Sequence, residues 1–289
     1  MPPAKRLIVS ADDFGMSPGV NEAVLRAHTD GVLTDAGLMV NGAAADDAIA
    51  RARAAPGLSV GLHLVLAQGR ATLPANEIPD LVDADGCFRN QPIGAALGYF
   101  FTPGVRAQVR REISAQIEKF LASGLPLSHV DGHVNIHMHP TILNMLLELA
   151  EPYGIRALRL TVEPLRAALR IDGDQAARKI AEGLTFRALA AYARPRMAAH
   201  RVRHPDRMFG LHQSGHLTES YLLRLLPTVT AGVTEIYCHP ARIDDEVRRW
   251  RPADYESEAE LAALLSPRVA ERMHQLGIEL TTYRELGTS

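Results

Sequence analysis

The chain has 289 residues and a formal net charge of −2, and 47% of its residues are hydrophobic against 22% that are charged. This balance is typical of an ordinary globular protein that buries a large core. No run of about 18 apolar residues occurs, which excludes a helix that spans a membrane. The total charge is near neutral and therefore does not indicate whether the protein binds an acidic partner. We expect no nucleic-acid partner.

The two cysteines, Cys87 and Cys238, lie far apart and form no CxxC pair. This usage fits a reducing cytoplasm and gives no thiolate metal site. The first six residues lead straight into an apolar run, without the apolar core or cleavage site of a signal peptide. We therefore expect a cytoplasmic protein.

Apolar runs and helical patterns alternate along the chain. The first run, Arg6 to Ser10, predicts a buried strand that ends in Ala11-Asp12-Asp13-Phe14-Gly15. Similar runs predict strands at 36–40, 58–64, 155–160, 207–211, 233–238 and 277–283, and a shorter run lies at 125–127. Helical spacing predicts helices at 18–27, 44–54, 105–121 and 141–151, and a further helix that ends near residue 226. Two more helices are predicted to begin at Ser257 and at Ser266. Ser257 forms a capping-box pattern with Glu260.

About eight strands in alternation with helices favour an α/β fold of a single domain over residues 1–289. We expect a (β/α) barrel, or a distorted variant of it with seven to eight strands. Two segments interrupt the alternation. Residues 66–104 are irregular and predict a loop excursion beside the site, and residues 164–207 predict a helical insertion.

The 164–207 insertion is strongly basic, with ten Lys or Arg residues and four Asp or Glu residues. Apolar side chains are interspersed with these charges. One interpretation is a solvated helical face. The other is a surface that contacts an anionic partner or a membrane, which would place the protein at the inner membrane surface.

Four histidines and one aspartate lie within residues 128–140: His129, Asp131, His133, His137 and His139. Polar residues also lie at the C-terminal ends of three other predicted strands, namely Asp12 with Asp13, His63, and His239. A single histidine of this kind is often only a hydrogen-bonded core residue. In a barrel, however, the strand ends converge, and imidazole with carboxylate suits one divalent metal ion, zinc first and magnesium, nickel, cobalt or manganese less selectively.

The adjacent acids Asp12 and Asp13 present a geometric problem. Consecutive residues of a strand point to opposite sides, although the end of a strand can bend both side chains into one cavity. In that case one acid can bind metal while the other takes a proton from water. The alternative is that one of them caps the following helix.

The chain resembles the YdjC-like carbohydrate deacetylases through four motifs. They are Ala11-Asp12-Asp13-Phe14-Gly15, Gly61-Leu62-His63, the block from His129 to Pro140, and Cys238-His239-Pro240. The resemblance implies a (β/α) barrel in which Asp13, His63 and His133 are the metal ligands. It also implies that Asp12 is the general base and that His239 is the acid.

The chain departs from the family pattern after His133, where many members carry further histidines and this chain has Val134 and Asn135. His137 and His139 remain as reserve ligands. We expect His137 to share one helical face with His133, because the two are four residues apart. The remaining residues expected to support the ligands or to contact the substrate are His129, Asp131, Asn41 and Phe14.

Within this family the chain is most similar to the branch associated with hopanoid biosynthesis, through residues 62–66, 78–86 and 232–237. That resemblance implies a substrate in which N-acetylglucosamine is linked to a hopanoid lipid. The alternatives are a soluble chitooligosaccharide as substrate, a barrel metallo-phosphoesterase, or a carbohydrate- or lipid-binding protein without catalysis. A phosphoesterase usually needs more carboxylates for two or three metals, and a carrier would lack the base or the acid.

Overall fold

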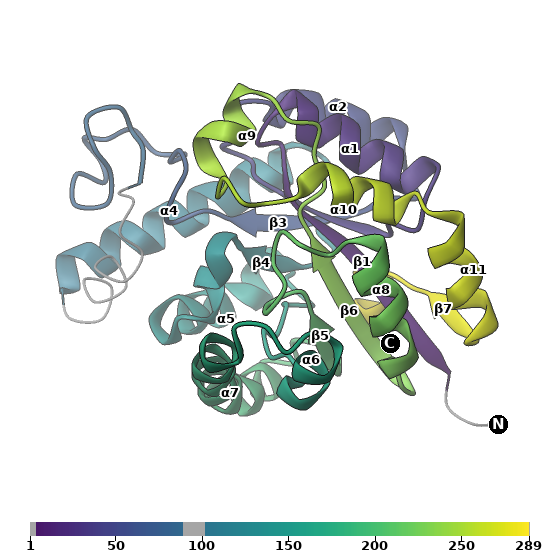
Figure 1. The fold of residues 1–289 in the computed structure, drawn as a ribbon. Coiled ribbons are helices and arrows are strands. Elements are labelled where there is room, and N and C mark those ends of the chain that lie inside the picture. The colour runs from purple at the N-terminus through teal and green to yellow at the C-terminus, as the bar shows by residue number, and fades with distance from the viewer. Residues whose placement is uncertain (1–3, 89–101, 289) are drawn as a thin grey trace.

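A parallel sheet lies at the centre of the protein in the computed structural model, which describes residues 4–88 and 102–288 (Figure 1). Within these residues the strand order is β4-β3-β2-β1-β6-β5, and β7 pairs with β1. The seven strands are β1 Lys5–Phe14, β2 Asp35–Leu38, β3 Ser59–Leu64, β4 Val130–Gly132, β5 Arg207–Phe209, β6 Gly232–Cys238 and β7 Ile278–Leu280.

The other strands are arranged around β1. β6 lies along most of its length on one edge. On the other edge, β7 pairs with the first half of β1 and β2 pairs with the second half. Every residue from Leu7 to Phe14 is buried, as in parallel strands that are covered on both faces. The C-terminal end of β1, which carries Asp12 and Asp13, therefore lies near the middle of the sheet.

The sheet is curled, but the expected closed barrel is not formed by the described residues. The predicted strand at 155–160 makes only the single bridges Val130↔Leu158 and Ala157↔Arg203. The carbonyl of Arg159 accepts a hydrogen bond from the His137 side chain and, among the described residues, from no strand backbone. The edge strands β4 and β5 have only three residues each, too few for the staggered pairing that closes a barrel.

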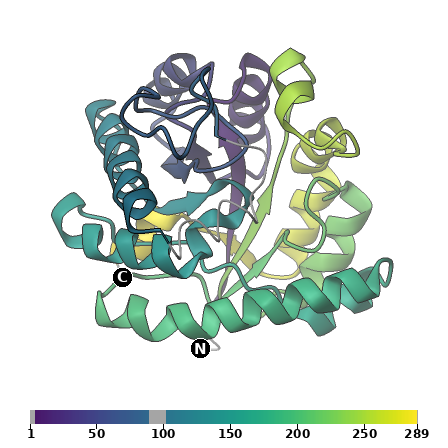
Figure 2. The ribbon, with the colours of Figure 1, turned by 90° about the vertical axis from the view of Figure 1, so that its left-hand side faces the viewer.

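Helices surround the curled sheet (Figure 2). They are α1 Pro18–Thr29, α2 Ala45–Ala54, α4 Pro103–Ala122, α5 Pro140–Tyr153, α6 Leu165–Ile171, α7 Ala176–Ala199, α8 Glu219–Leu225, α9 Asp245–Trp250, α10 Ser257–Leu264, α11 Pro267–Gln275 and α12 Tyr283–Thr288. Ser17 and Ser266 cap α1 and α11, because their side chains accept hydrogen bonds from the first turn of these helices. The helix start predicted at Ser266 is confirmed. One core cluster contains side chains from β1 to α11. No helix among the described residues is long and apolar enough to cross a bilayer.

The two predicted excursions have different structures. Residues 65–88 are largely irregular and are fixed to α4, where Glu112 accepts hydrogen bonds from the backbone of Thr72 and Leu73. The rest of that excursion, residues 89–101, lies outside the described residues. The basic 164–207 insertion consists of α6 and α7, and it leads into β5.

Candidate metal centre

Both acids at the end of β1 face the same cavity. The pairing of β1 with β2 is irregular between Ala11 and Phe14, and Asp13 has a left-handed backbone with φ of 67°. This bulge removes the alternation that would separate the two side chains. Asp12 and Asp13 are both buried, and both line a cavity of about 800 Å³.

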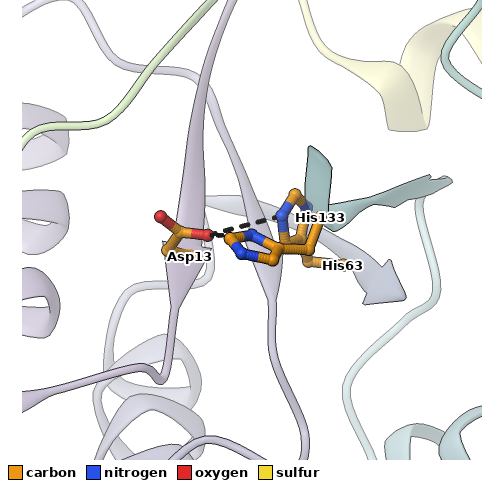
Figure 3. A group of neighbouring side chains, drawn as sticks. All are labelled: Asp13, His63 and His133. Atoms are coloured by element: carbon orange, nitrogen blue, oxygen red, sulfur yellow. Dashed lines mark hydrogen bonds and ion pairs between the residues drawn. The ribbon is translucent and has the colours of Figure 1, made fainter. Parts of the chain in front are cut away.

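Asp13, His63 and His133 form a compact group of potential metal ligands (Figure 3). They come from the ends of β1 and β3 and from the residue after β4. Asp13 Oδ1 lies 3.0 Å from His133 Nδ1 and 3.5 Å from His63 Nε2. Ligand atoms held about 2.0 Å from one tetrahedral ion are roughly 3.3 Å apart, so these spacings fit a shared ion.

The hydrogen bonding of the two imidazoles also fits a metal site. Within the described residues, His63 Nε2, which faces Asp13, is buried and makes no hydrogen bond. Buried polar atoms normally have a partner, and an ion between His63 Nε2, His133 Nδ1 and Asp13 would supply one. A second geometric group, Asp12 with His63 and Asp131, is less suitable because Arg159 binds both of its carboxylates.

Asp131 fixes the orientation of His63. Its Oδ1 accepts a hydrogen bond from His63 Nδ1 at 2.8 Å, which leaves Nε2 directed toward Asp13. Histidine ligands of metals are commonly held by a carboxylate in this way. Burial lowers the pKa of His63, but the carboxylates of Asp131, Asp12 and Asp13 outweigh burial and raise it to about 10.

Arg159 connects the carboxylates behind the site. Its guanidinium donates to both oxygens of Asp12, each at 2.8 Å, and lies 2.8 Å from Asp131 Oδ2. Its Nε donates to Glu235 at 2.9 Å. Arg159 was not predicted as a site residue, although an arginine flanked by leucines inside the run 155–160, which also contains Arg156, could have indicated one. A charge buried in a strand requires acidic partners.

A second unpredicted arginine, Arg251, holds the other side of the metal group. Its Nε donates to Asp13 Oδ2 at 3.0 Å, and its Nη1 donates to the carbonyl of His239 at 2.6 Å. Burial opposes the charge on Asp13, but Arg251 and then His133 hold the pKa of Asp13 well below its usual range. Arg251 lies beyond the end of α9, where nothing in the local sequence indicates contact with β1.

The predicted capping box at Ser257 is wrong. Glu256 is the N-cap residue of α10, and it makes no side-chain cap. The carboxylate of Glu260 instead accepts hydrogen bonds from the backbone of Leu217 and of His239. Glu260 therefore anchors the segment that carries the proposed acid.

His239 lies in the same cavity as the ligand group. Its Nε2 is 4.0 Å from Asp12 Oδ2, and its ring packs against Tyr237 and Tyr255. Burial lowers the pKa of His239 to about 4, although Asp13 and Asp12 oppose this effect. The side chain is therefore neutral at pH 7, and it can accept a proton before donating one.

His137 does not share a helical face with His133, contrary to the prediction. The segment His133–Met138 is a distorted 3₁₀ helix in which Val134 and Asn135 have left-handed backbone angles. His137 is turned away and donates from Nε2 to the Arg159 carbonyl at 3.2 Å. It belongs to neither ligand group among the described residues, and the same is true of His139.

The other predicted supporting residues lie farther from the ligand group. His129 is buried and stacks on Tyr283 with ring centroids 3.9 Å apart. Phe14 is a fully buried core residue. Asn41 donates to the Arg70 carbonyl and lines a separate small hollow. The structure thus gives His129 and Phe14 packing roles, while Asn41 holds the 65–88 excursion.

The outer part of the cavity is lined by aromatic and polar side chains. Trp250 and Tyr255 lie on the side of α9 and α10, and Phe186 comes from α7. Lys179 and Glu182, also on α7, add charged groups to the same wall. The basic insertion therefore forms part of the cavity that contains Asp13.

Comparison with known proteins gives a consistent result over the whole chain. The model of the YdjC-like protein family matches residues 6–275. A carbohydrate deacetylase of Geobacillus stearothermophilus is 34% identical over 279 residues, which covers 96% of each chain. A carbohydrate deacetylase of Brevibacillus brevis is 33% identical over 284 residues and is covered completely, with 98% of this chain.

A solved structure has the same fold. It is the crystal structure of a putative cellobiose-phosphate cleavage protein from Enterococcus faecalis, with a TM-score of 0.75 and 30% identity. The match covers 98% of this chain and 99% of the other.

Proposed function

Because the chain belongs to the family of YdjC-like proteins, we propose that it is a metal-dependent hydrolase that removes the N-acetyl group of an acetylated amino sugar. The observation that carries this proposal is that the potential metal ligands Asp13, His63 and His133 line the same cavity as Asp12. The curated relatives named carbohydrate deacetylases support the substrate class.

Asp13, His63 and His133 would hold one divalent ion. Their nitrogen and oxygen donors suit zinc first, and magnesium, nickel, cobalt or manganese less selectively. When bound, the ion supplies Lewis-acid polarisation of the acetyl carbonyl and of the attacking water. Arg251 holds Asp13 Oδ2, so that Oδ1 remains directed toward the two histidines.

Asp12 is the proposed general base. Arg159 binds both of its oxygens, but each carboxylate oxygen has a second lone pair that can accept a proton from water. The paired hydrogen bonds also fix the plane of the carboxylate. Asp12 is therefore oriented for proton transfer without being a ligand of the ion.

His239 is the proposed acid for the amine leaving group. It is neutral in the free protein, so it must receive its proton during the reaction. The 4.0 Å between His239 Nε2 and Asp12 Oδ2 is short enough for transfer of that proton through one water or a small movement. His239 then donates it to the sugar nitrogen as the carbon–nitrogen bond breaks.

We propose a lipid-linked sugar, an N-acetylglucosaminyl hopanoid, as the substrate. This proposal rests on the sequence resemblance at residues 62–66, 78–86 and 232–237 and on the basic α6 and α7 at the cavity wall. A soluble chitooligosaccharide is the second candidate, because the aromatic side chains of Trp250 and Tyr255 can pack on sugar rings without any lipid.

Two assays on metal-loaded protein separate these possibilities from a phosphoesterase. Acetate release is measured with N-acetylglucosamine linked to a hopanoid and with chitooligosaccharides, and phosphate release is measured with a phosphomonoester. We expect acetate from the lipid-linked sugar and no phosphate. Acetate only from the soluble sugars would reject the lipid-linked substrate, and phosphate release without acetate would reject the deacetylase.

A further inference from the structure

The outward side of α7 carries an unusual apolar stripe. Its exposed residues are spaced three and four apart, which places them on one side of a helix: Ala177, Ile180, Leu184, Ala188, Ala191 and Pro195. Leu184 is 59% exposed and Ile180 is 42% exposed. The outward side of a helix in a globular protein is normally polar, so this stripe requires an explanation.

α7 already has a separate buried side. Lys179, Ala190, Ala193 and Met197 face the protein, and the helix runs along one margin of the molecule (Figure 2). The apolar stripe is therefore not the side that packs on the core. It is a second apolar surface, and it is open to the outside in the described residues.

Two arginines border the stripe on one side. With 100° between successive residues, Arg187 and Arg194 fall next to the stripe, whereas Arg178 and Arg196 lie about a third of a turn away on the other side. The only acid of α7 is Glu182, whose carboxylate is bound by His212 at 2.8 Å. Arg187 and Arg194 have no ion-pair partner among the described residues.

We infer that α7 docks the protein on an anionic membrane surface. An apolar stripe beside a row of arginines suits a helix that lies in the interface, with leucine and isoleucine among the acyl chains and arginine at the phosphates. The charge argues against a second copy of the chain as the occupant. Pairing two such faces would bring arginines together without carboxylates to neutralise them.

The position of the cavity gives this docking a consequence for catalysis, which rests on the proposed function. Lys179 and Phe186 reach the cavity from the inward side of α7, and the helix is only about 10 Å thick. The docked protein would hold its cavity within one helix diameter of the lipid headgroups. A sugar on a membrane lipid could then enter without leaving the bilayer surface.

The test is sedimentation of the full chain with vesicles of phosphatidylcholine alone and of phosphatidylcholine mixed with phosphatidylglycerol. We expect binding to the anionic vesicles that weakens as salt is added. The double variant Arg187→Ala/Arg194→Ala should bind about 25-fold more weakly, at about fivefold for each arginine. Leu184→Asp should lose tenfold or more, roughly the effect of withdrawing one leucine from the interface.

Leu280→Asp and Arg26→Glu are matched controls, because both positions are exposed and lie outside α7. They should bind vesicles as the unchanged protein does. Failure of the unchanged protein to bind anionic vesicles at low salt would overturn the proposal. Equal vesicle binding by the α7 variants and the controls would also overturn the proposal. So would the finding that the unchanged protein is a dimer in solution and that Leu184→Asp dissociates this dimer.

Turnover of a soluble N-acetylated sugar separates this proposal from the proposed function. Leu184, Arg187 and Arg194 do not line the cavity, so the α7 variants should keep that activity. Vesicle binding without any acetate release would reject the deacetylase but leave the docking surface. Acetate release without vesicle binding would reject the docking surface but leave the deacetylase.

Discussion

Asp131 Oδ1 accepts a hydrogen bond from His63 Nδ1 at 2.8 Å, and this contact fixes the free edge of the imidazole toward Asp13. Asp131 is fully buried and is itself held by Arg159. The orientation of His63 on β3 thus depends on Asp131 of β4 and, through it, on Arg159, which lies after α5.

Replacement of Asp131 should weaken metal binding without removing a ligand. Asp131→Asn keeps the size of the side chain but weakens the contact that orients His63. We expect a 10- to 100-fold loss of metal affinity, the usual effect of removing such a partner. Titration calorimetry measures it, and Asp30→Asn, at an exposed position, is the control that should bind metal normally.

Metal binding should tighten as the pH rises. The pKa of His63 is raised to about 10, so below that pH a proton occupies the ring and must leave when the ion binds. Displacement of one proton gives about a tenfold gain in affinity for each pH unit from neutral pH up to the pKa. Calorimetry in two buffers of different ionisation enthalpy measures the released proton, and a pH-independent affinity would contradict the account.

Variants at Asp12 and at His133 should distinguish a loss of catalysis from a loss of metal binding. Asp12→Asn keeps the hydrogen-bonding shape beside Arg159 but cannot accept the proton, so turnover should fall by about 100- to 10,000-fold while metal content stays normal. His133→Ala should lose the metal itself. Activity assays with metal analysis on both variants check this, and normal turnover by Asp12→Asn would remove it as the base.

Arg159 should be important for stability. Arg159→Met leaves Asp12, Asp131 and Glu235 buried without their shared counter-charge. Removing one member of a buried ion network costs about 3 to 5 kcal/mol, and urea denaturation of metal-free protein should show a loss of this size. Arg26→Met, an exposed arginine on α1, should unfold as the unchanged chain does.

The apolar runs and the helical spacing were sufficient to predict most of the alternating elements. They also place Asp13, His63 and His133 at or just beyond strand ends, which parallel strands bring together at one end of a sheet. The assignment of these three side chains as metal ligands came from the family resemblance and stays a prediction. The bulge that turns Asp12 and Asp13 to the same side was foreseen only as one of two outcomes. Its cause is the left-handed backbone of Asp13, a conformation that a non-glycine residue rarely adopts.

The arginines and the shape of the sheet could not be derived in the same way. Arg251 reaches Asp13 from 238 residues away, and no local pattern carries that information. Barrel closure depends on the lengths of β4 and β5 and on where the carbonyl of Arg159 bonds. The expected helical pairing of His133 with His137 failed because Val134 and Asn135 take left-handed angles, which helical spacing cannot indicate.

The central claim is that one ion held by Asp13, His63 and His133 enables Asp12 to promote deacetylation. Acetate release from an N-acetylglucosaminyl substrate, followed while zinc is titrated into metal-free protein, tests it most directly. We expect activity to rise linearly and to stop rising at one ion per chain, with Asp12→Asn inactive at the same occupancy. Full activity of the metal-free protein, or a maximum reached only with two ions per chain, would contradict the claim.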